Sequence, residues 1–287
     1  MEGRAAAPGA GTVLNALATG VGSAFAIDLE TRATVSLDPD AGEVTGEIAE
    51  LDGDADTALI ERCVELVVAA HGDGEGGHVR TESDVPLAAG LKSSSAAANA
   101  TVLATLSALD AADAVSRIDA CRLGVRAARD AGVTVTGAFD DASASMLGGV
   151  TLTDNTADEL LSRAERDWDV LVWTPPERAF SADADVDRCA RVAPMAELVA
   201  ELAREGRFGE AMTVNGLAYS AVLEFPTAPA VEAMPHAAGV SLSGTGPSVV
   251  AVGDRKDLAT VRGRWDERPG ETRLTTTRPD GARIASD

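Results

Sequence analysis

The fold of this chain is decided by one stretch of its sequence, Pro86-Leu-Ala-Ala-Gly-Leu-Lys-Ser-Ser-Ser-Ala-Ala-Ala-Asn-Ala100. A turn around Gly90 runs into three serines and then into alanines, which favour a helix. At the start of such a helix, backbone N–H groups and hydroxyls converge where the helix dipole is positive, and this suits a phosphate. The stretch also contains Lys92, one of only two lysines among 24 basic residues. We therefore predict a phosphate-binding loop with a cation beside it.

The loop differs from a Walker A motif, because Leu91 stands where that motif has glycine. Backbone N–H groups and hydroxyls can nevertheless surround phosphate oxygens in the same way, and a hydroxyl can reach a magnesium ion. A simpler interpretation is a serine that caps an ordinary alanine-rich helix. In the first interpretation the serines contact a ligand. In the second, a serine side chain forms a hydrogen bond with the helix backbone.

Composition excludes several classes of protein. The chain has 287 residues, of which 45% are hydrophobic, enough for one large domain or two ordinary ones. It has no apolar run of the roughly 18–20 residues that a membrane span needs and no signal-peptide pattern, so a soluble cytoplasmic protein is expected. The net charge of −22 argues against nucleic acid and anionic membranes as partners. Three cysteines and three histidines are too scattered for a disulfide framework or a zinc site.

The acidic residues are spread among apolar ones, as in Asp52, Asp54 and Asp56, and do not form a single tail. Together with the near absence of lysine, this pattern resembles the proteins of halophiles that accumulate salt. At molar salt the Debye length falls to about 3 Å, so repulsion between the acids is screened. We therefore expect the stability of the fold to decrease when salt is removed.

Alternating and helical spacings of apolar residues predict an α+β chain. Expected strands cover residues 11–15, 22–28, 33–37, 44–48, 79–83, 148–153, 170–173 and 273–277, and the flanks of a glycine loop within 239–253. Expected helices continue from the three serines as far as residue 109 and cover residues 56–70, 114–131, 157–166, 194–205, 209–224, 229–238 and 256–265. A boundary near residue 165 divides the chain into domains of residues 1–165 and 166–287.

Two further motifs are candidates for a ligand site. In Ser241-Leu-Ser-Gly-Thr-Gly-Pro-Ser248, Gly244 and Gly246 allow positive φ angles and a close approach of the backbone to a ligand, although a plain hairpin would use them as well. In Gly137-Ala-Phe-Asp-Asp141, two adjacent carboxylates follow a glycine turn. They either cap the next helix or, beside an ATP phosphate and a hydroxyl substrate, supply a base for phosphoryl transfer.

In order and spacing, these motifs resemble the GHMP kinase superfamily, which includes galactokinase and the homoserine, mevalonate and phosphomevalonate kinases. That superfamily binds ATP with a Pro-x-x-x-Gly-Leu-Gly-Ser-Ser loop, and residues 86–94 match it except at Lys92. Residues 10–15 correspond to its first motif and residues 241–247 to its last. Together with Ala-Thr-Gly-Val-Gly-Ser-Ala-Phe at 18–25, they are similar to the archaeal-type shikimate kinases.

The resemblance implies a two-domain α+β fold of the GHMP kinase type, with the active site in the cleft between the domains. It also implies phosphorylation of shikimate by ATP to 3-phosphoshikimate, in aromatic amino acid synthesis. Mg²⁺ is the implied metal, bound by Ser94 or, alternatively, by Ser93. The residues implied in ATP binding are Pro86, Leu87, Ala88, Ala89, Gly90, Leu91, Lys92, Ser93, Ser94, Ser95 and Ala96, with Gly244, Thr245 and Gly246 from the late glycine loop.

Two residues are expected to be catalytic. Alignment of the glycines selects Asp140 over Asp141 as the base that takes the hydroxyl proton. The mevalonate kinase branch has a lysine in its first motif, and the matching position here is Thr12. We therefore expect Lys92 to supply this charge from the other side of the phosphates, since a lysine is a compact point charge.

Two alternative functions remain open at this stage. Homoserine kinase shares the Gly-Leu-x-Ser-Ser and Ser-Gly-x-Gly-Pro patterns, but its branch generally lacks the catalytic aspartate, which favours shikimate as the substrate. A non-catalytic nucleotide-binding protein on the same fold is the second alternative. The carboxylate of shikimate calls for a bidentate arginine, which the spacing does not select, and the oligomeric state is not predicted.

Overall fold

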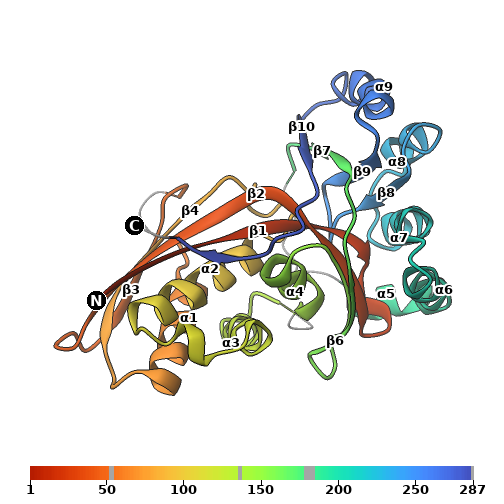
Figure 1. The fold of residues 1–287 in the computed structure, drawn as a ribbon. Helices are drawn as coiled ribbons and strands as arrows, with labels where there is room; N and C mark the ends of the chain where they lie inside the picture. The colour runs from red at the N-terminus through yellow and green to blue at the C-terminus, as the bar shows by residue number, and fades with distance from the viewer. Residues whose placement is uncertain (52–54, 135–137, 178–184, 286–287) are drawn as a thin grey trace.

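A computed structural model describes residues 1–51, 55–134, 138–177 and 185–285 of the chain, which form two β-sheets with helices packed against them (Figure 1). In the first sheet the strands follow the order β11-β1-β2-β4-β3, and β5 joins β2 to β6. These strands are β1 (Glu2–Leu14), β2 (Val21–Asp38), β3 (Val44–Ile48), β4 (Gly76–Ser83), β5 (Val150–Asp154), β6 (Glu159–Ala164) and β11 (Arg283–Ile284). The second sheet has the order β10-β7-β9-β8, with β7 (Asp169–Thr174), β8 (Gly239–Leu242), β9 (Val249–Gly253) and β10 (Glu271–Thr276).

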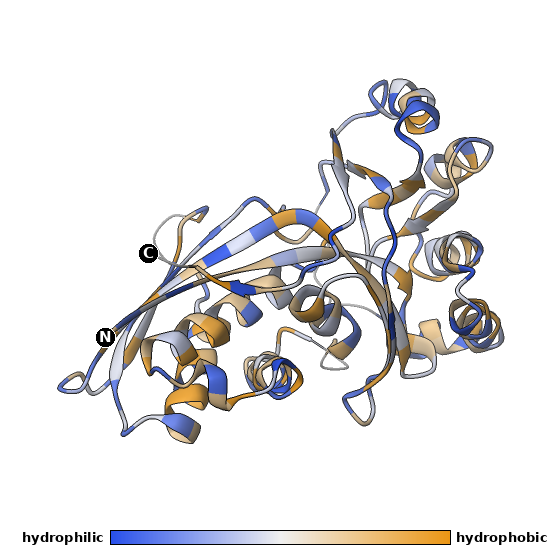
Figure 2. Ribbon diagram, viewed as in Figure 1, coloured by the Kyte–Doolittle hydropathy of each residue, from blue (hydrophilic) through white to orange (hydrophobic). Residues whose placement is uncertain are grey.

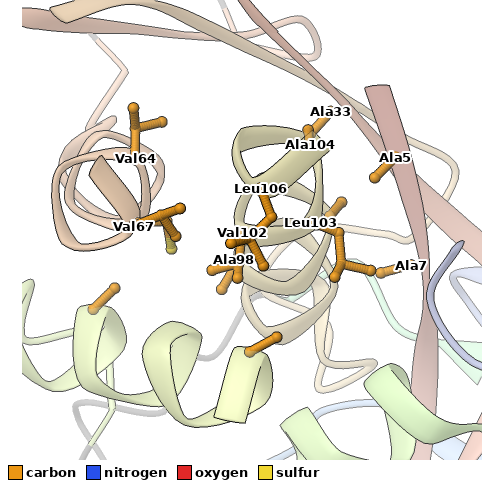
Figure 3. Close-up of a cluster of buried hydrophobic side chains, with 14 of the residues drawn as sticks. Ala5, Ala7, Ala33, Val64, Val67, Ala98, Val102, Leu103, Ala104 and Leu106 are labelled. Atoms are coloured by element: carbon orange, nitrogen blue, oxygen red, sulfur yellow. The ribbon is translucent and has the colours of Figure 1, made fainter. Parts of the chain in front are cut away.

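Helix α2 is the centre of the larger hydrophobic core. It lies against β1 and β2 and between the two flanking helices α1 and α3 (Figure 3). Small residues on both elements accompany this close packing: α2 is rich in alanine, and a Cβ on Gly3 of β1 would overlap the carbonyl oxygen of Ala104. The alanine-rich composition is therefore required by the packing as well as by helix propensity. The helices of this half are α1 (Ala58–His71), α2 (Ser93–Ala108), α3 (Arg117–Asp130) and α4 (Phe139–Leu147), with a 3₁₀ turn η1 (Ala16–Ala18).

A second core lies between the smaller sheet and its helices. Large side chains such as Trp265, Tyr219 and Leu171 are fully buried there. The helices are α5 (Val186–Cys189), α6 (Ala193–Arg204), α7 (Phe208–Val222), α8 (Ala228–Ala233) and α9 (Arg255–Trp265). Figure 2 shows hydrophobic residues interspersed with hydrophilic ones along these elements. Within the described ranges, no helix is both long and apolar enough to cross a membrane.

The α+β class is confirmed, and most predicted elements lie within a few residues of the observed ones. The helix predicted over 157–166 is wrong, because residues 159–164 form β6, an edge strand that pairs with β5. Its polar sequence looks helical, but a tight turn at Asp158 (φ +49°) returns the chain alongside β5, which then satisfies the backbone of β6. The strands predicted at 22–28 and 33–37 are one continuous strand, β2.

The carboxyl-terminal segment returns to the first sheet, an arrangement that the sequence did not predict. Strand β11 pairs with β1, and Glu30 of β2 accepts hydrogen bonds from Arg278 at 2.8 Å and from Arg283 at 2.7 and 3.0 Å. The predicted boundary near residue 165 lies in the connection between β6 and β7. Residues 283–284 therefore pack with the amino-terminal half, and the division into two domains stays a prediction.

Candidate active site

A cavity of about 680 Å³ collects residues from all the sequence motifs. It is bounded by the end of β1, the loop before α2, the start of α4 and the loop between β8 and β9. Of the residues that the sequence singled out, its lining includes Thr12, Asn15, Leu87, Ala88, Gly90, Lys92, Ser93, Ser94, Asp140, Asp141, Gly244 and Thr245. The lining does not include Pro86, Ala89, Leu91, Ser95, Ala96 or Gly246. Residues as far apart in the chain as Thr12 and Gly244, 232 positions, thus meet at one place.

The loop before α2 has the conformation of a ligand cradle. Ala88, Gly90 and Lys92 all have positive φ angles, of 53°, 78° and 66°. Lys92 is the residue before the helix, and its side chain makes no capping hydrogen bond to the helix backbone. The start of α2 is therefore not capped by a side chain, contrary to the simpler interpretation of the serines. Ser93 and Ser94, at the start of this helix, line the cavity, and the first N–H groups of a helix have no partner within the helix.

The two glycine loops are joined to each other. Ser243 Oγ donates a hydrogen bond of 2.8 Å to the carbonyl oxygen of Gly90, and the N–H of Ser248 donates one of 3.3 Å to that of Ala89. A side chain at position 90 would overlap the carbonyl of Ser243, so only glycine fits this approach. The late glycine loop, residues 241–248, is thus joined by hydrogen bonds to the loop before α2.

The first motif, residues 10–15, also forms hydrogen bonds with the late glycine loop. The N–H of Gly244 donates to Thr12 Oγ1 at 2.8 Å, and Asn15 Nδ2 donates to the carbonyl of Gly244 at 2.9 Å. Two residues of α7 hold Asn15 in turn: Asn215 Oδ1 accepts from its N–H at 2.9 Å, and Tyr219 Oη donates to its carbonyl at 2.9 Å. Neither residue is among the predicted site residues, although two polar residues four positions apart in an apolar helix are a recognisable signal.

Lys92 is a buried cation with one acidic partner. Its Nζ lies 3.0 Å from Oδ1 of Asp141, and the side chain is only 6% exposed. The ammonium group also borders Gly244, where an added Cβ would lie 2.7 Å from Nζ. The structure therefore brings the predicted catalytic lysine next to both Asp141 and the late glycine loop.

Asp140 is held in a different environment from Asp141. Asn155 Nδ2 donates a 2.7 Å hydrogen bond to its Oδ1, and Asn155 Oδ1 accepts the N–H of Asp140 at 3.0 Å. The carboxylate packs against Gly22 of β2, where a Cβ would lie 2.5 Å from Oδ2. Burial and then the charge of Asp141 raise the pKa of Asp140 to about 7, against the opposing effects of Lys92 and Asn155.

One expectation from sequence has no counterpart in the described part of the cavity. No arginine lines it there, so the arginine expected for the shikimate carboxylate is not identified. The described residues also hold no cluster of three or more His, Cys, Asp or Glu side chains suited to a metal ion. Gly137, which opens the aspartate motif, lies outside the described residues.

Comparison with known proteins gives the same family at several levels. Residues 58–149 match the family model of the GHMP kinases N terminal domain, and residues 195–271 match that of the GHMP kinases C terminal domain. The shikimate kinase of Halobacterium salinarum is 69% identical over 283 residues, which cover 99% of each chain. The shikimate kinase of Methanosarcina mazei is 48% identical over 96% of this chain and 94% of its own.

Solved structures agree on the fold. Homoserine kinase from Cytophaga hutchinsonii superposes with a TM-score of 0.76 at 17% identity, over 99% of this chain and 97% of that one. Galactokinase from Lactococcus lactis gives 0.75 at 15% identity, over 98% and 95%. Such distant likeness shows a shared fold and says nothing of a shared substrate. With the near-complete 69% match and both domain models, this chain belongs to the shikimate kinase family that is built on GHMP kinase domains.

Proposed function

We propose that this enzyme transfers the γ-phosphoryl group of ATP to a hydroxyl of shikimate and so forms 3-phosphoshikimate and ADP. The observation that carries the proposal is the meeting of Lys92, the Asp140–Asp141 pair and the Gly244 loop in one cavity. Membership of the shikimate kinase family supports shikimate as the acceptor. Homoserine kinase is only a distant neighbour in fold, at 17% identity, and so gives no support for homoserine.

We propose that the phosphates of ATP occupy the cradle formed by residues 86–96 and 244–246. Three features support this placement: positive φ angles that turn the loop toward the cavity, the uncapped start of α2, and the glycines that leave room for a ligand. Helix N-termini favour phosphate through their N–H groups and dipole. In a chain of net charge −22, the buried Lys92 gives this site its positive charge.

The reaction needs one base and one group that stabilises negative charge. The shikimate hydroxyl oxygen bonds to the γ-phosphorus, the bond from that phosphorus to the β-phosphate oxygen breaks, and the hydroxyl proton passes to a carboxylate of the aspartate pair. The alignment of glycines proposes Asp140 for this role. Lys92 is proposed to stabilise the charge that spreads over the transferred group.

We propose Ser94 as the protein ligand of Mg²⁺, with Ser93 as the alternative. The donor chemistry fits, because Mg²⁺ takes oxygen ligands and is commonly held by one or two protein groups plus substrate phosphates. Both hydroxyls are in the first turn of α2 and line the cavity. When bound, Mg²⁺ would neutralise phosphate charge.

A panel of acceptors tests the proposed function. ADP release is measured at high salt with shikimate, homoserine, mevalonate and galactose, each with ATP and Mg²⁺. Of the four acceptors, we expect only shikimate to be phosphorylated. Phosphorus NMR of the product should show one new phosphate monoester. Preferred turnover of homoserine, or nucleotide binding without turnover of any acceptor, would overturn the proposal.

A further inference from the structure

Asn99 is a fully buried amide within an alanine-rich helix. It lies on α2, in the second turn after Ser93, and none of its surface is exposed. Its neighbours in the chain, Ala98 and Ala100, are buried as well. A buried amide is unfavourable unless its polar atoms are paired, so its place in this core calls for a physical explanation.

The side chain of Asn99 reaches from α2 to the helix that carries the aspartate pair. Its Nδ2 donates a hydrogen bond of 2.9 Å to the carbonyl oxygen of Ala142 in α4. Ala142 directly follows Asp140 and Asp141 in the chain. The bond therefore joins the helix that begins at the proposed phosphate cradle to the helix that begins with the two aspartates.

Stability alone does not account for this amide. In an α-helix each carbonyl already accepts the N–H four residues later, and Met146, four residues after Ala142, lies within α4. The other polar atom of the amide, Asn99 Oδ1, is buried with no hydrogen-bond partner among the described residues. A half-satisfied amide in the core lowers the free energy of unfolding relative to an apolar side chain of the same shape. The amide is better explained by the helix that it positions.

The apolar contact between α2 and α4 has no preferred direction. The two helices lie next to each other (Figure 1), and buried alanines such as Ala98 and Ala142 belong to the same hydrophobic core. Small methyl groups tolerate a shift of one helix along the other, whereas a hydrogen bond holds only within a narrow range of distance and angle. A single buried amide can thereby fix how two packed helices are aligned.

The alignment of α2 and α4 sets the geometry of the cavity. Asp140 and Asp141 both line the cavity, and Asp141 lies 3.0 Å from Lys92. Lys92 is the residue immediately before α2, and Ser93 is the first residue of that helix. A shift between the two helices would therefore move both aspartates relative to the lysine and the serines. Misplacement of reacting groups by about 1 Å can lower a rate by about 10²-fold.

We propose that Asn99 is a positioning residue that holds the aspartate helix α4 at a fixed place relative to the proposed phosphate cradle. Asn99 is not among the described residues that line the cavity, so it acts through the backbone of Ala142. The positions of both aspartates depend on this bond alike. The inference rests on the proposed phosphoryl transfer, in which the two helices carry the aspartates and the phosphate cradle of one reaction.

Asn99→Leu tests the inference, because leucine has the branching of asparagine but no polar atom. In the shikimate assay at multimolar KCl, we expect kcat to fall by about tenfold or more. KM for ATP and the affinity for ADP should change by less than about threefold, since the cradle itself is unaltered. The melting temperature should stay the same or rise, because a half-satisfied buried amide is removed. A purely structural role predicts the reverse, a lower melting temperature with unchanged kcat.

Thr105→Val is the matched control on the same helix. Thr105 is fully buried, and its Oγ1 donates a hydrogen bond of 2.8 Å to the carbonyl of Thr101, also in α2. Valine removes this buried hydroxyl without loss of a bond to α4, so kcat should stay within about twofold of the wild type. Asn99→Ala is measured in parallel, in case leucine does not fit. It should show the same decrease in kcat with KM for ATP retained, although the space that it leaves should lower its melting temperature.

Several results would overturn the inference. One is a kcat within about twofold of wild type in the Asn99 variants, and another is an equal loss of kcat in Thr105→Val. A parallel loss of kcat and ADP affinity, or failure of both Asn99 variants to fold, would make the role of Asn99 structural. The wild-type enzyme is assayed first: turnover of another acceptor in place of shikimate refutes the proposed function alone, and the variants are then compared with that acceptor. Without turnover of any acceptor, both proposals fail.

Discussion

Replacement of Lys92 by methionine tests the site most directly. Methionine keeps the length of the side chain but removes the charge 3.0 Å from Asp141. Breaking a buried ion pair by removing one partner costs about 3–5 kcal/mol. The lower end applies here, because Asp141 is still partly open to the cavity and a salt solution can reach it. A loss of about 3 kcal/mol corresponds to a decrease of about 5–10 °C in the melting temperature for a chain of this size.

The effect of Lys92→Met on catalysis should exceed its effect on stability. Loss of one group that stabilises transition-state charge typically lowers kcat by about 10²–10³-fold. Disturbance of Asp141 adds to this loss, so we expect a decrease of at least about 10³-fold in total. Lys92→Arg should recover only part of the activity, because the planar guanidinium is larger and Gly244 leaves little space around Nζ.

The assay combines ADP release at high salt with thermal unfolding. The chain offers a matched control in Lys256→Met, since its only other lysine is exposed on α9 and lies outside the described cavity lining. This control should leave kcat and the melting temperature unchanged. In the double variant Lys92→Met/Asp141→Asn, the melting temperature should recover because no unpaired charge is left, but kcat should not. A Lys92→Met enzyme within twofold of wild-type kcat would refute the reasoning.

Three further predictions follow from the packing and charge of the fold. Gly22→Ala would place a Cβ 2.5 Å from the Asp140 carboxylate, so kcat should fall at least about tenfold. In the control Gly42→Ala, the added Cβ would have no atom within 4 Å, so kcat should stay unchanged. Hydrogen bonding to Arg283 chiefly lowers the pKa of Glu30 to about 2, below its ordinary value of 4.5, so this group stabilises the fold above pH 4.5 and less as the pH falls toward 2. The difference in melting temperature between wild type and Glu30→Gln should narrow over that interval; a gap that widens in acid contradicts this assignment. Finally, the melting temperature should fall between about 3 M and about 0.1 M KCl, where screening weakens, and an unchanged value would exclude a salt-dependent fold.

The sequence indicated the fold class and the segments that line the cavity, but not all of the pairings between strands. The three motifs and Lys92 are local patterns, and each was recognised before the structure brought them together. Residues 159–164 form a strand because they pair with β5, and this pairing outweighs the helical preference of a polar segment. Strand β11 is two residues long, too short to leave any periodic pattern.

Long-range contacts account for what was missed at the site itself. Asn155 lies only 15 positions from Asp140, but nothing in the sequence indicates that a residue just after β5 forms hydrogen bonds with the start of the preceding helix, α4. Asn215 and Tyr219 contact Asn15 across 200 and 204 positions. The choice of Asp140 over Asp141 as the base rests on an alignment of glycines, and it stays a prediction.

The hydrogen bonds between the two glycine loops limit which chimeric enzymes can be built from this chain. Ser243, Gly244 and Ser248 donate hydrogen bonds to Thr12 and to the loop around Gly90, so segments from both halves of the chain form the cradle proposed for the phosphates. In a chimera with the carboxyl-terminal half of a distant homologue, the new half would have to form the same hydrogen bonds to Thr12 and to the loop around Gly90. This holds even where both parent enzymes use the same substrate. The two halves are therefore expected to be inherited and engineered as one unit.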